Sequence, residues 1–261
     1  MKAMILAAGL GTRMRPLTDH CPKPLLPVAG KALIVHHIEQ LVALGIEDIV
    51  INHAYLGHMI EAALGDGRQF GCHIQYSAEQ QALETGGGIY KALPLLSEGD
   101  VEGDHHYECE KTAPPFLLVN GDVWLDWEGI QIPHTIQGDC HLWLVKNPAH
   151  NLAGDFVLTA ANRVLDKADS SATDKTALTF SGLSLLKPSL FNAVLPELLA
   201  SGIFPLAPLL RNAMALGKAS GELYRGNWID VGTPERLQQV EDLLMASTAA
   251  KQMEKSRAGT I

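Results

Sequence analysis

The sequence predicts an α/β fold with a mostly parallel central sheet. Apolar, strand-like segments alternate with helical segments through the first 120 residues of the 261-residue chain. This alternation is typical of strand–helix–strand units with right-handed crossovers. Hydrophobic residues make up 47% of the chain, which is enough for one sizeable core.

The first half of the chain gives the clearest pattern. A strand is predicted at residues 2–7, where apolar residues are continuous, as in a strand buried on both faces. A loop interrupted by prolines follows over residues 8–30. Residues 33–44 have apolar side chains at helical spacing, and a glycine ends the pattern. The next predicted elements are a strand at 47–53, a helix at 55–64, a strand at 72–77, a helix at 84–96 and a strand with a polar end at 115–124.

The second half is less regular. We expect one domain over residues 1–250, with halves at 1–125 and 126–250, a charged surface loop at 98–112 and a frayed tail at 251–261. Its predicted elements are strands at 139–147, 155–159 and 177–188, a hairpin turn near Asn162, helices at 188–200 and 205–217, a strand within 221–233 and a closing helix at 234–246.

Composition limits the function classes. The net charge of −9 argues against binding along a nucleic-acid backbone. No apolar run approaches the ~20 residues of a membrane span, and the first residues lack the features of a secretory signal. The four cysteines form no CxxC pair. We therefore expect a cytoplasmic protein with reduced thiols and with no nucleic-acid or membrane partner.

Three polar stretches follow predicted strands, at residues 7–16, 77–88 and 120–124. Ligands of parallel α/β sheets bind outside the carboxyl ends of the strands. Because the three stretches fall at such ends, we expect them to meet around one ligand.

The stretch MILAAGLGTRMRPLT, residues 4–18, contains a glycine-rich turn. It lacks the third glycine of a dinucleotide fingerprint, because residue 14 is methionine, and the chain has no GxxxxGK[ST] string. What remains is a loop with backbone N–H groups near Gly9, Gly11 and Thr12 and with cations at Arg13 and Lys23. Such a set suits a polyphosphate, although an ordinary surface turn is the alternative.

The strings LAAGLGTRMRPLT and PKPLLPVAGKALI together resemble the signature of sugar-1-phosphate nucleotidylyltransferases. The resemblance continues through ETGGGI, VNGDVW, LTFSGLSLL and YRGNWIDVGTPERL, and so covers most of the chain. It implies a three-layer, Rossmann-like nucleotidyltransferase fold with a small sugar-binding subdomain. Only about 25 residues follow the last motif, too few for a repeat solenoid, so no β-helix domain is expected.

The resemblance also implies a reaction. An oxygen of a sugar 1-phosphate attacks the α-phosphorus of a nucleoside triphosphate and releases pyrophosphate, with Mg²⁺ as cofactor. The motifs are most similar to the branch that transfers uridylyl groups from UTP to N-acetylmuramate 1-phosphate in cell-wall recycling. Guanylyl or thymidylyl transfer to a hexose phosphate, or a noncatalytic sugar-nucleotide-binding role, stays open. A monomer or small homo-oligomer is expected.

Residue roles follow from the same resemblance. Hard carboxylate oxygens suit Mg²⁺, and the resemblance assigns that role to Asp122 and Asp230. Arg13 and Lys23 would be the catalytic cations. The implied nucleotide-binding residues are Ala8, Gly9, Gly11, Thr12, Arg13, Lys23 and Gly87, and the implied sugar-binding residues are Glu84, Asn120 and Asp155. Many relatives have a Glu-Lys-Pro motif whose lysine binds the sugar phosphate. Here only Lys167 and Lys175 lie nearby, outside such a motif.

Overall fold

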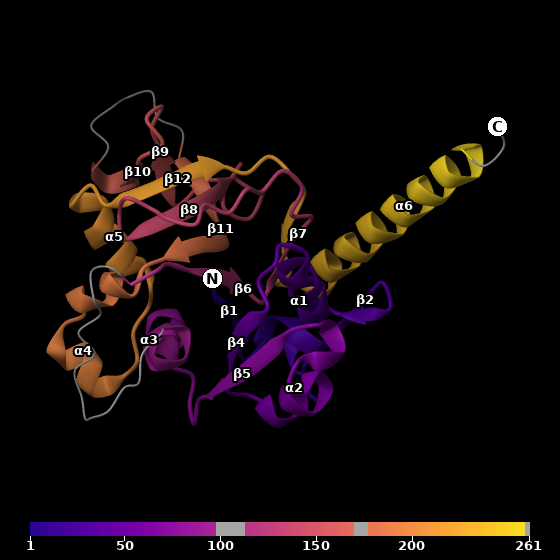
Figure 1. Ribbon diagram of the computed structural model, residues 1–261, viewed down its shortest axis with the longest axis horizontal. Helices are drawn as coiled ribbons and strands as arrows, with labels where there is room; N and C mark the ends of the chain where they lie inside the picture. The colour runs from indigo at the N-terminus through magenta and orange to yellow at the C-terminus, as the bar shows by residue number, and fades with distance from the viewer. Residues whose placement is uncertain (98–112, 170–176, 259–261) are drawn as a thin grey trace.

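Nine strands of the described residues, 1–97, 113–169 and 177–258, form one central sheet in this computed structural model (Figure 1). The order along the sheet is β10-β9-β11-β6-β1-β4-β5, with β8 paired to β11 and β12 paired to β8. The sheet strands are β1 (Ala3–Leu6), β4 (Asp48–His53), β5 (His73–Ala78), β6 (Phe116–Asn120), β8 (Cys140–Val145), β9 (Phe156–Leu158), β10 (Val164–Asp166), β11 (Ala177–Leu186) and β12 (Ala219–Leu223).

The strand directions bring several strand ends to one edge. The pairs β1–β4, β1–β6, β4–β5 and β8–β12 are parallel, while β11 runs antiparallel to β6 and β8. The carboxyl ends of β1, β4, β5 and β6 therefore share an edge. The predicted α/β fold with a mainly parallel sheet is confirmed, and the antiparallel strands β10 and β11 make that sheet mixed.

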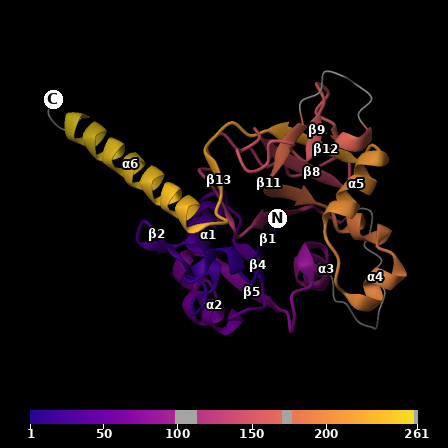
Figure 2. The same ribbon diagram turned by 180° about the vertical axis from the view of Figure 1, so that it is seen from behind.

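Helices cover both faces of the sheet (Figures 1 and 2). Apolar side chains of α1 and α2 belong to one buried cluster with the sheet, and those of α3 and α5 belong to a second. Each cluster contains residues from both halves of the chain, so the halves share their cores. The helices are α1 (Leu33–Ala43), α2 (Gly57–Leu64), α3 (Glu84–Leu96), α4 (Pro196–Ser201), α5 (Ala207–Ala215) and α6 (Pro234–Ala258), with short 3₁₀ turns η1 (Thr12–Met14), η2 (Lys23–Leu25), η3 (Arg68–Phe70), η4 (Lys167–Asp169) and η5 (Pro188–Ala193).

Two predicted elements are divided. The helix expected at 188–200 is a 3₁₀ turn, η5, followed by the separate helix α4, because the residue before Pro196 is held in an extended conformation. The strand expected at 115–124 ends at Asn120. A turn at Gly121 and Asp122 then leads into β7 (Val123–Leu125), which pairs with β13 (Trp228–Asp230).

The β7–β13 ribbon connects the sheet to the last helix. A third buried cluster joins Trp124 of β7 to Leu237 and Val240 of α6. Helix α6 is longer than predicted, since it includes residues 251–258 that were expected to fray, and it extends away from the body (Figure 1). A second short ribbon pairs β2 (Pro27–Val28) with β3 (Lys31–Ala32). The loop predicted at 98–112 lies outside the described residues, and none of the described helices is long and apolar enough to span a bilayer.

Candidate functional site

A cavity of about 400 Å³ opens at the edge where β1, β4, β5 and β6 end. All three polar stretches singled out in the sequence contribute to its wall. Of the predicted site residues, those lining it are Ala8, Gly9, Gly11, Thr12, Arg13, Lys23, Glu84, Asn120 and Asp122. The wall also includes Asn52, Glu79 and Gly232, to which the sequence analysis gave no individual role, although Glu79 belongs to the 77–88 stretch.

The glycine-rich loop after β1 carries unused backbone donors. Within the described residues, the N–H groups of residues 8–11 donate no hydrogen bond. Gly11 has φ +63°, and a Cβ at this position would lie 3.0 Å from the Thr18 side chain. The Thr18 hydroxyl donates to the Gly11 carbonyl at 2.8 Å, which fixes the turn. A cavity wall of free N–H groups can bind phosphate oxygens or the acceptor edge of a base.

Asn52 and Glu79 hold two walls of the cavity together. Asn52, at the end of β4, accepts a hydrogen bond from the N–H of Ala7 at 2.9 Å and donates to Glu79 Oε1 at 2.6 Å. Glu79 Oε2 accepts from the N–H of Leu83 at 3.0 Å. Asn52 and Glu79 are 2% and 6% exposed. This buried network fixes the start of the glycine-rich loop relative to the 79–83 segment.

Helix α3 begins at the cavity with Glu84, whose φ of +59° is unusual for a residue with a side chain. A non-glycine residue held in this region is strained, and such strain gathers at functional sites. The next turn of the helix contains three glycines. A Cβ at Gly88 would lie 2.7 Å from Glu79 Oε1, so this glycine lets the helix approach the buried network.

Gly87 does not line the cavity. Its N–H donates to the Phe204 carbonyl at 3.0 Å, and a Cβ on it would collide with the carbonyl oxygen of Gly202. The structure therefore places the predicted nucleotide-binding Gly87 where helix α3 packs against the segment before α5. Its glycine identity is explained by close backbone packing.

Lys23 brings a buried charge to the cavity. Pro22 is extended and leads into η2, which begins at Lys23. The Lys23 side chain is 9% exposed, and its Nζ lies 3.2 Å from Asp122 Oδ2. Arg13 is exposed, and a Cβ built on Gly232 would lie 3.2 Å from its Nη1. One cation therefore lies beside Asp122 and another beside Gly232.

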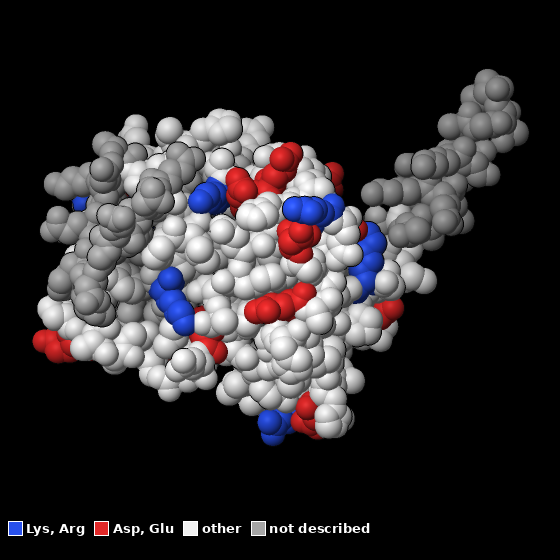
Figure 3. Space-filling view, turned by 60° about the horizontal axis from the view of Figure 1, so that its bottom comes forward, with Lys and Arg blue, Asp and Glu red and all other residues white. Residues whose placement is uncertain are grey.

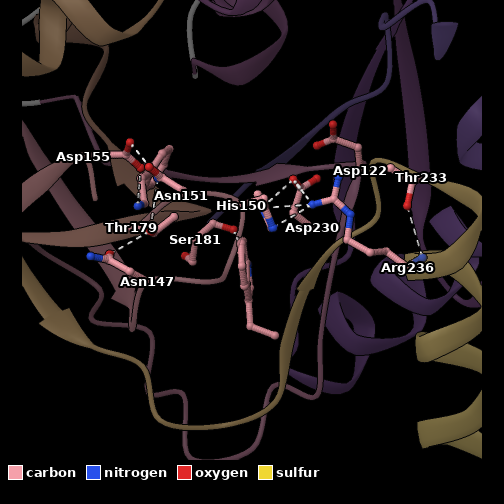
Figure 4. A network of polar contacts seen from close by, with 12 residues as sticks. Asp122, Asn147, His150, Asn151, Asp155, Thr179, Ser181, Asp230, Thr233 and Arg236 are labelled. Carbon is pink, nitrogen blue, oxygen red and sulfur yellow. Dashed lines mark hydrogen bonds and ion pairs between the residues drawn. The ribbon is translucent and has the colours of Figure 1, made fainter. Parts of the chain in front are cut away.

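Asp230 lies next to the cavity, at the end of β13. The ribbon register pairs Asp230 with Val123, and the N–H of Val231 donates to the Asp122 carbonyl at 2.8 Å. The two aspartates are thus neighbours across the ribbon despite their distance in sequence. Figure 4 shows Asp230 between His150 and Arg236, with Asp122 close by.

The donor set of this pair fits Mg²⁺. Asp122 Oδ2 contacts Lys23 and Asp230 Oδ2 contacts Arg236 and His150, while within the described residues neither Oδ1 accepts a hydrogen bond. In that part of the chain, no three His, Cys, Asp or Glu side chains are grouped to hold a metal unaided. Mg²⁺ commonly uses one or two carboxylates and takes its other ligands from waters and substrate phosphates.

Asp155 has a different setting. Its Oδ2 accepts from the N–H of Phe180 at 2.9 Å and its Oδ1 accepts from Asn151 at 3.1 Å, so the carboxylate holds the 146–155 loop against β11. It does not line the described cavity. Lys167 donates to the Gly154 carbonyl of the same loop at 2.8 Å, and Lys175 lies outside the described residues. The sugar-binding role of Asp155 stays a prediction.

A buried histidine supports the turn that carries Asp122. His37 of α1 is 1% exposed, and its Nε2 lies 2.8 Å from the Val123 carbonyl. Burial lowers the pKa of His37 to about 4, although the bond to that carbonyl opposes the shift. The ring is therefore neutral near pH 7, with its Nε2–H donating to Val123.

Sequence reasoning missed Asn52, Glu79, His150 and Arg236. Asn52 follows an apolar strand as Asn120 does, so its position at a strand end was a usable signal. His150 and Arg236 lie in a loop and a helix where polar side chains are ordinary. Basic and acidic side chains are interspersed on the face of the molecule in Figure 3, so no strongly charged patch points to a site there.

Comparisons with known proteins found relatives in sequence and in fold. A family model described as nucleotidyl transferase matches residues 2–126. The N-acetylmuramate alpha-1-phosphate uridylyltransferase of Neisseria meningitidis serogroup B is 45% identical over 251 residues, 93% of this chain and 98% of the relative. The protein of the same name from Caulobacter vibrioides is 36% identical, covering 89% and 92%. In the solved structures, HddC from Yersinia pseudotuberculosis complexed with GMP-PN matches the fold with a TM-score of 0.69 and 20% identity, over 93% of this chain and 99% of that chain.

Proposed function

The chain belongs to the sugar-1-phosphate nucleotidyltransferase family, and we propose that it transfers the uridylyl group of UTP to N-acetylmuramate 1-phosphate. The substrate pair is proposed from the names of the two similar relatives, whose length this chain nearly spans. One structural observation supports the chemistry. Lys23, Asp122 and Asp230 come together beside a glycine-rich loop with unused N–H donors.

The reaction is an in-line displacement. An oxygen of the sugar phosphate forms a bond to the α-phosphorus of UTP, and the bond from that phosphorus to the bridging oxygen breaks. The electron pair of the broken bond leaves on pyrophosphate. The protein has little covalent chemistry to do, so positioning and charge stabilisation supply the catalysis.

Each residue then has a proposed role. The free N–H groups of residues 8–11 bind the base edge and phosphate oxygens of UTP, while the Asn52–Glu79 network keeps that wall in place. The buried Lys23 ammonium faces the α-phosphate and the attacking phosphate, and Arg13 stabilises the departing pyrophosphate. Glu84, Asn120 and Asp155 are proposed to contact the sugar.

Asp122 and Asp230 are proposed to hold Mg²⁺. When bound, the ion neutralises phosphate charge during transfer. The chain contributes two carboxylates whose Oδ2 atoms are already held by cationic side chains, so their Oδ1 atoms are the ones offered as ligands. Cytoplasmic location is part of the proposal, and the three described cysteines, which form no disulfide, are compatible with it.

Pyrophosphate release from purified protein tests the proposal. We expect UTP with N-acetylmuramate 1-phosphate to turn over much faster than GTP with mannose 1-phosphate or dTTP with glucose 1-phosphate, and chelation by EDTA to stop it. Arg13→Ala should fold normally and lose about 10²–10³ in rate. The opposite ranking of substrates would replace the substrate assignment. Absence of turnover with every pair would favour a noncatalytic binding role.

A further inference from the structure

We infer that Arg236 is a positioning residue that fixes the Asp230 carboxylate for the proposed metal ion. Arg236 lies in the first turn of α6, and its Nη1 donates to Asp230 Oδ2 at 2.9 Å. The two side chains are 15% and 22% exposed, so water competes weakly for the pair. The inference rests on the proposed function, because the metal belongs to that reaction.

His150 completes a triangle of contacts around the same oxygen. Its Nε2 lies 3.2 Å from Asp230 Oδ2 and 2.9 Å from Arg236 Nη1, and its Nδ1 lies 3.0 Å from the same Nη1. Asp230 Oδ2 is thus held from two directions, by α6 and by the 146–155 loop (Figure 4).

The other oxygen of the carboxylate, Asp230 Oδ1, accepts no hydrogen bond within the described residues. A Cβ on Gly232 would lie 3.2 Å from this oxygen and from Arg13 Nη1, and it would collide with Arg236 Nη2. The lack of a side chain at Gly232 therefore lets the guanidinium reach Asp230. A carboxylate with one oxygen held and the other free is pre-oriented to bind a metal, and loss of such a supporting bond typically costs 10–100-fold in metal affinity.

Three other roles for Arg236 predict different results. A competitor for Asp230 would weaken metal binding, so removing it would tighten that binding. A direct phosphate ligand would affect nucleotide binding without metal. A mere anchor of α6 would lower the unfolding temperature and leave the affinity of the folded site unchanged.

Mn²⁺ titration separates these roles. Free Mn²⁺ is measured by electron paramagnetic resonance with full-length protein and the nonhydrolysable α,β-methylene analogue of UTP, with a protein-free titration subtracted. We expect Arg236→Gln to weaken Mn²⁺ binding by about 10- to 100-fold and Arg236→Lys to weaken it less. Arg211→Gln is the matched control. Arg211 lies on α5 and also pairs with an aspartate, since its Nε is 2.9 Å from Asp166 Oδ2, but this pair is not part of the proposed metal site. The control substitution should leave Mn²⁺ binding unchanged.

A double-mutant cycle tests whether Arg236 acts through Asp230. In an Asp230→Asn background, Arg236→Gln should have little further effect on Mn²⁺ affinity. Unchanged or tighter Mn²⁺ binding in Arg236→Gln would overturn the inference. Weaker binding of the UTP analogue by Arg236→Gln than by wild type in EDTA, where no metal is available, would also overturn it. So would a loss of Mn²⁺ affinity on Arg236→Gln that is as large in the Asp230→Asn background as in wild type.

The test also distinguishes this inference from the proposed function. If another nucleotide proves to be the substrate, the titration is repeated with its analogue and the expectation for Arg236 is the same. If wild-type protein binds no Mn²⁺ with any nucleotide, both the proposed metal site and the role of Arg236 are wrong. If wild type turns over the proposed substrates and Arg236→Gln binds Mn²⁺ normally, only the role of Arg236 is wrong.

Discussion

Lys23 and Asp122, 99 positions apart in the sequence, form an ion pair of 3.2 Å in which the lysine is almost fully buried. The aspartate side chain is 45% exposed, so the pair lies at the boundary between core and cavity. A buried ammonium at the edge of an open cavity can transfer its interaction from the aspartate to an incoming phosphate. Its main contribution is therefore expected in catalysis.

Lys23→Met should separate catalysis from stability at this position. We expect turnover to fall by about 10²–10³ because one cation at the reacting phosphates is lost. Stability should change little, since water can solvate the exposed Asp122. Pyrophosphate release and thermal unfolding measure the two effects. Lys31→Met is the control, because Lys31 pairs with Glu39 at 2.6 Å on an exposed surface and should affect neither. A Lys23→Met protein with normal turnover would contradict the assignment.

Asn52→Leu should destabilise the protein and weaken nucleotide binding together. The substitution leaves the N–H of Ala7 and the carboxylate of Glu79 without their buried partner, at a cost of about 1–3 kcal/mol. Urea unfolding and equilibrium dialysis with UTP measure the two effects. Gln238→Leu, which removes an exposed hydrogen bond to Asp242, should leave both unchanged. If Asn52→Leu has wild-type stability, the network does not hold the wall of the cavity.

Gly87→Ala and Gly9→Ala should have opposite consequences. A methyl group on Gly87 would collide with the Gly202 carbonyl, so we expect a clear fall in unfolding temperature. Gly9 lines the cavity and has nothing within 4 Å of its Cβ position, so Gly9→Ala should fold normally and bind UTP more weakly. Thermal unfolding with and without UTP distinguishes the two. A stable Gly87→Ala protein that binds UTP poorly would support the predicted nucleotide-binding role of Gly87.

His37 should make stability depend on pH in mildly acidic solution. Its pKa is lowered to about 4 in the folded protein, while an unfolded histidine has its ordinary value near 6.5. Between these values the unfolded state binds more protons, so folding stability falls as pH decreases from about 6.5 to about 4. The full loss is on the order of 3 kcal/mol. The free energy of unfolding, measured with urea at several pH values across this range, should change less with pH for His37→Gln than for wild type. An equal pH dependence of the two proteins would contradict the prediction.

The sequence predicted secondary structure correctly where the spacing of apolar residues agreed with the residues that favour turns and helix ends. Residues 84–96 form the predicted helix α3, and the turn predicted near Asn162 forms with φ +57° between β9 and β10. The converging loops line one cavity, as expected from parallel strands. The chain belongs to the family that the motifs resembled, and this follows from long strings rather than from the short glycine pattern alone.

The remaining features depend on tertiary structure. Gly87 occurs in a motif beside the cavity, but its Cβ position faces the carbonyl oxygen of Gly202, which is far away in sequence. Arg236 and His150 meet only because β13, α6 and the 146–155 loop converge on Asp230. No local spacing predicts such a meeting. Residues 188–200 have apolar side chains that suit a helix, yet one proline divides the segment.

The β7–β13 ribbon has a consequence for how this protein is made. Residues 120–126 and 228–232 form the two strand segments of the ribbon and supply one carboxylate each, so a nascent chain or fragment that stops at residue 126 has only one of them. The segment matched by the family model, residues 2–126, therefore contains only one of the two proposed metal ligands. With both carboxylates required, as we propose, activity during synthesis would begin only after β13 and the first turn of α6 have left the ribosome.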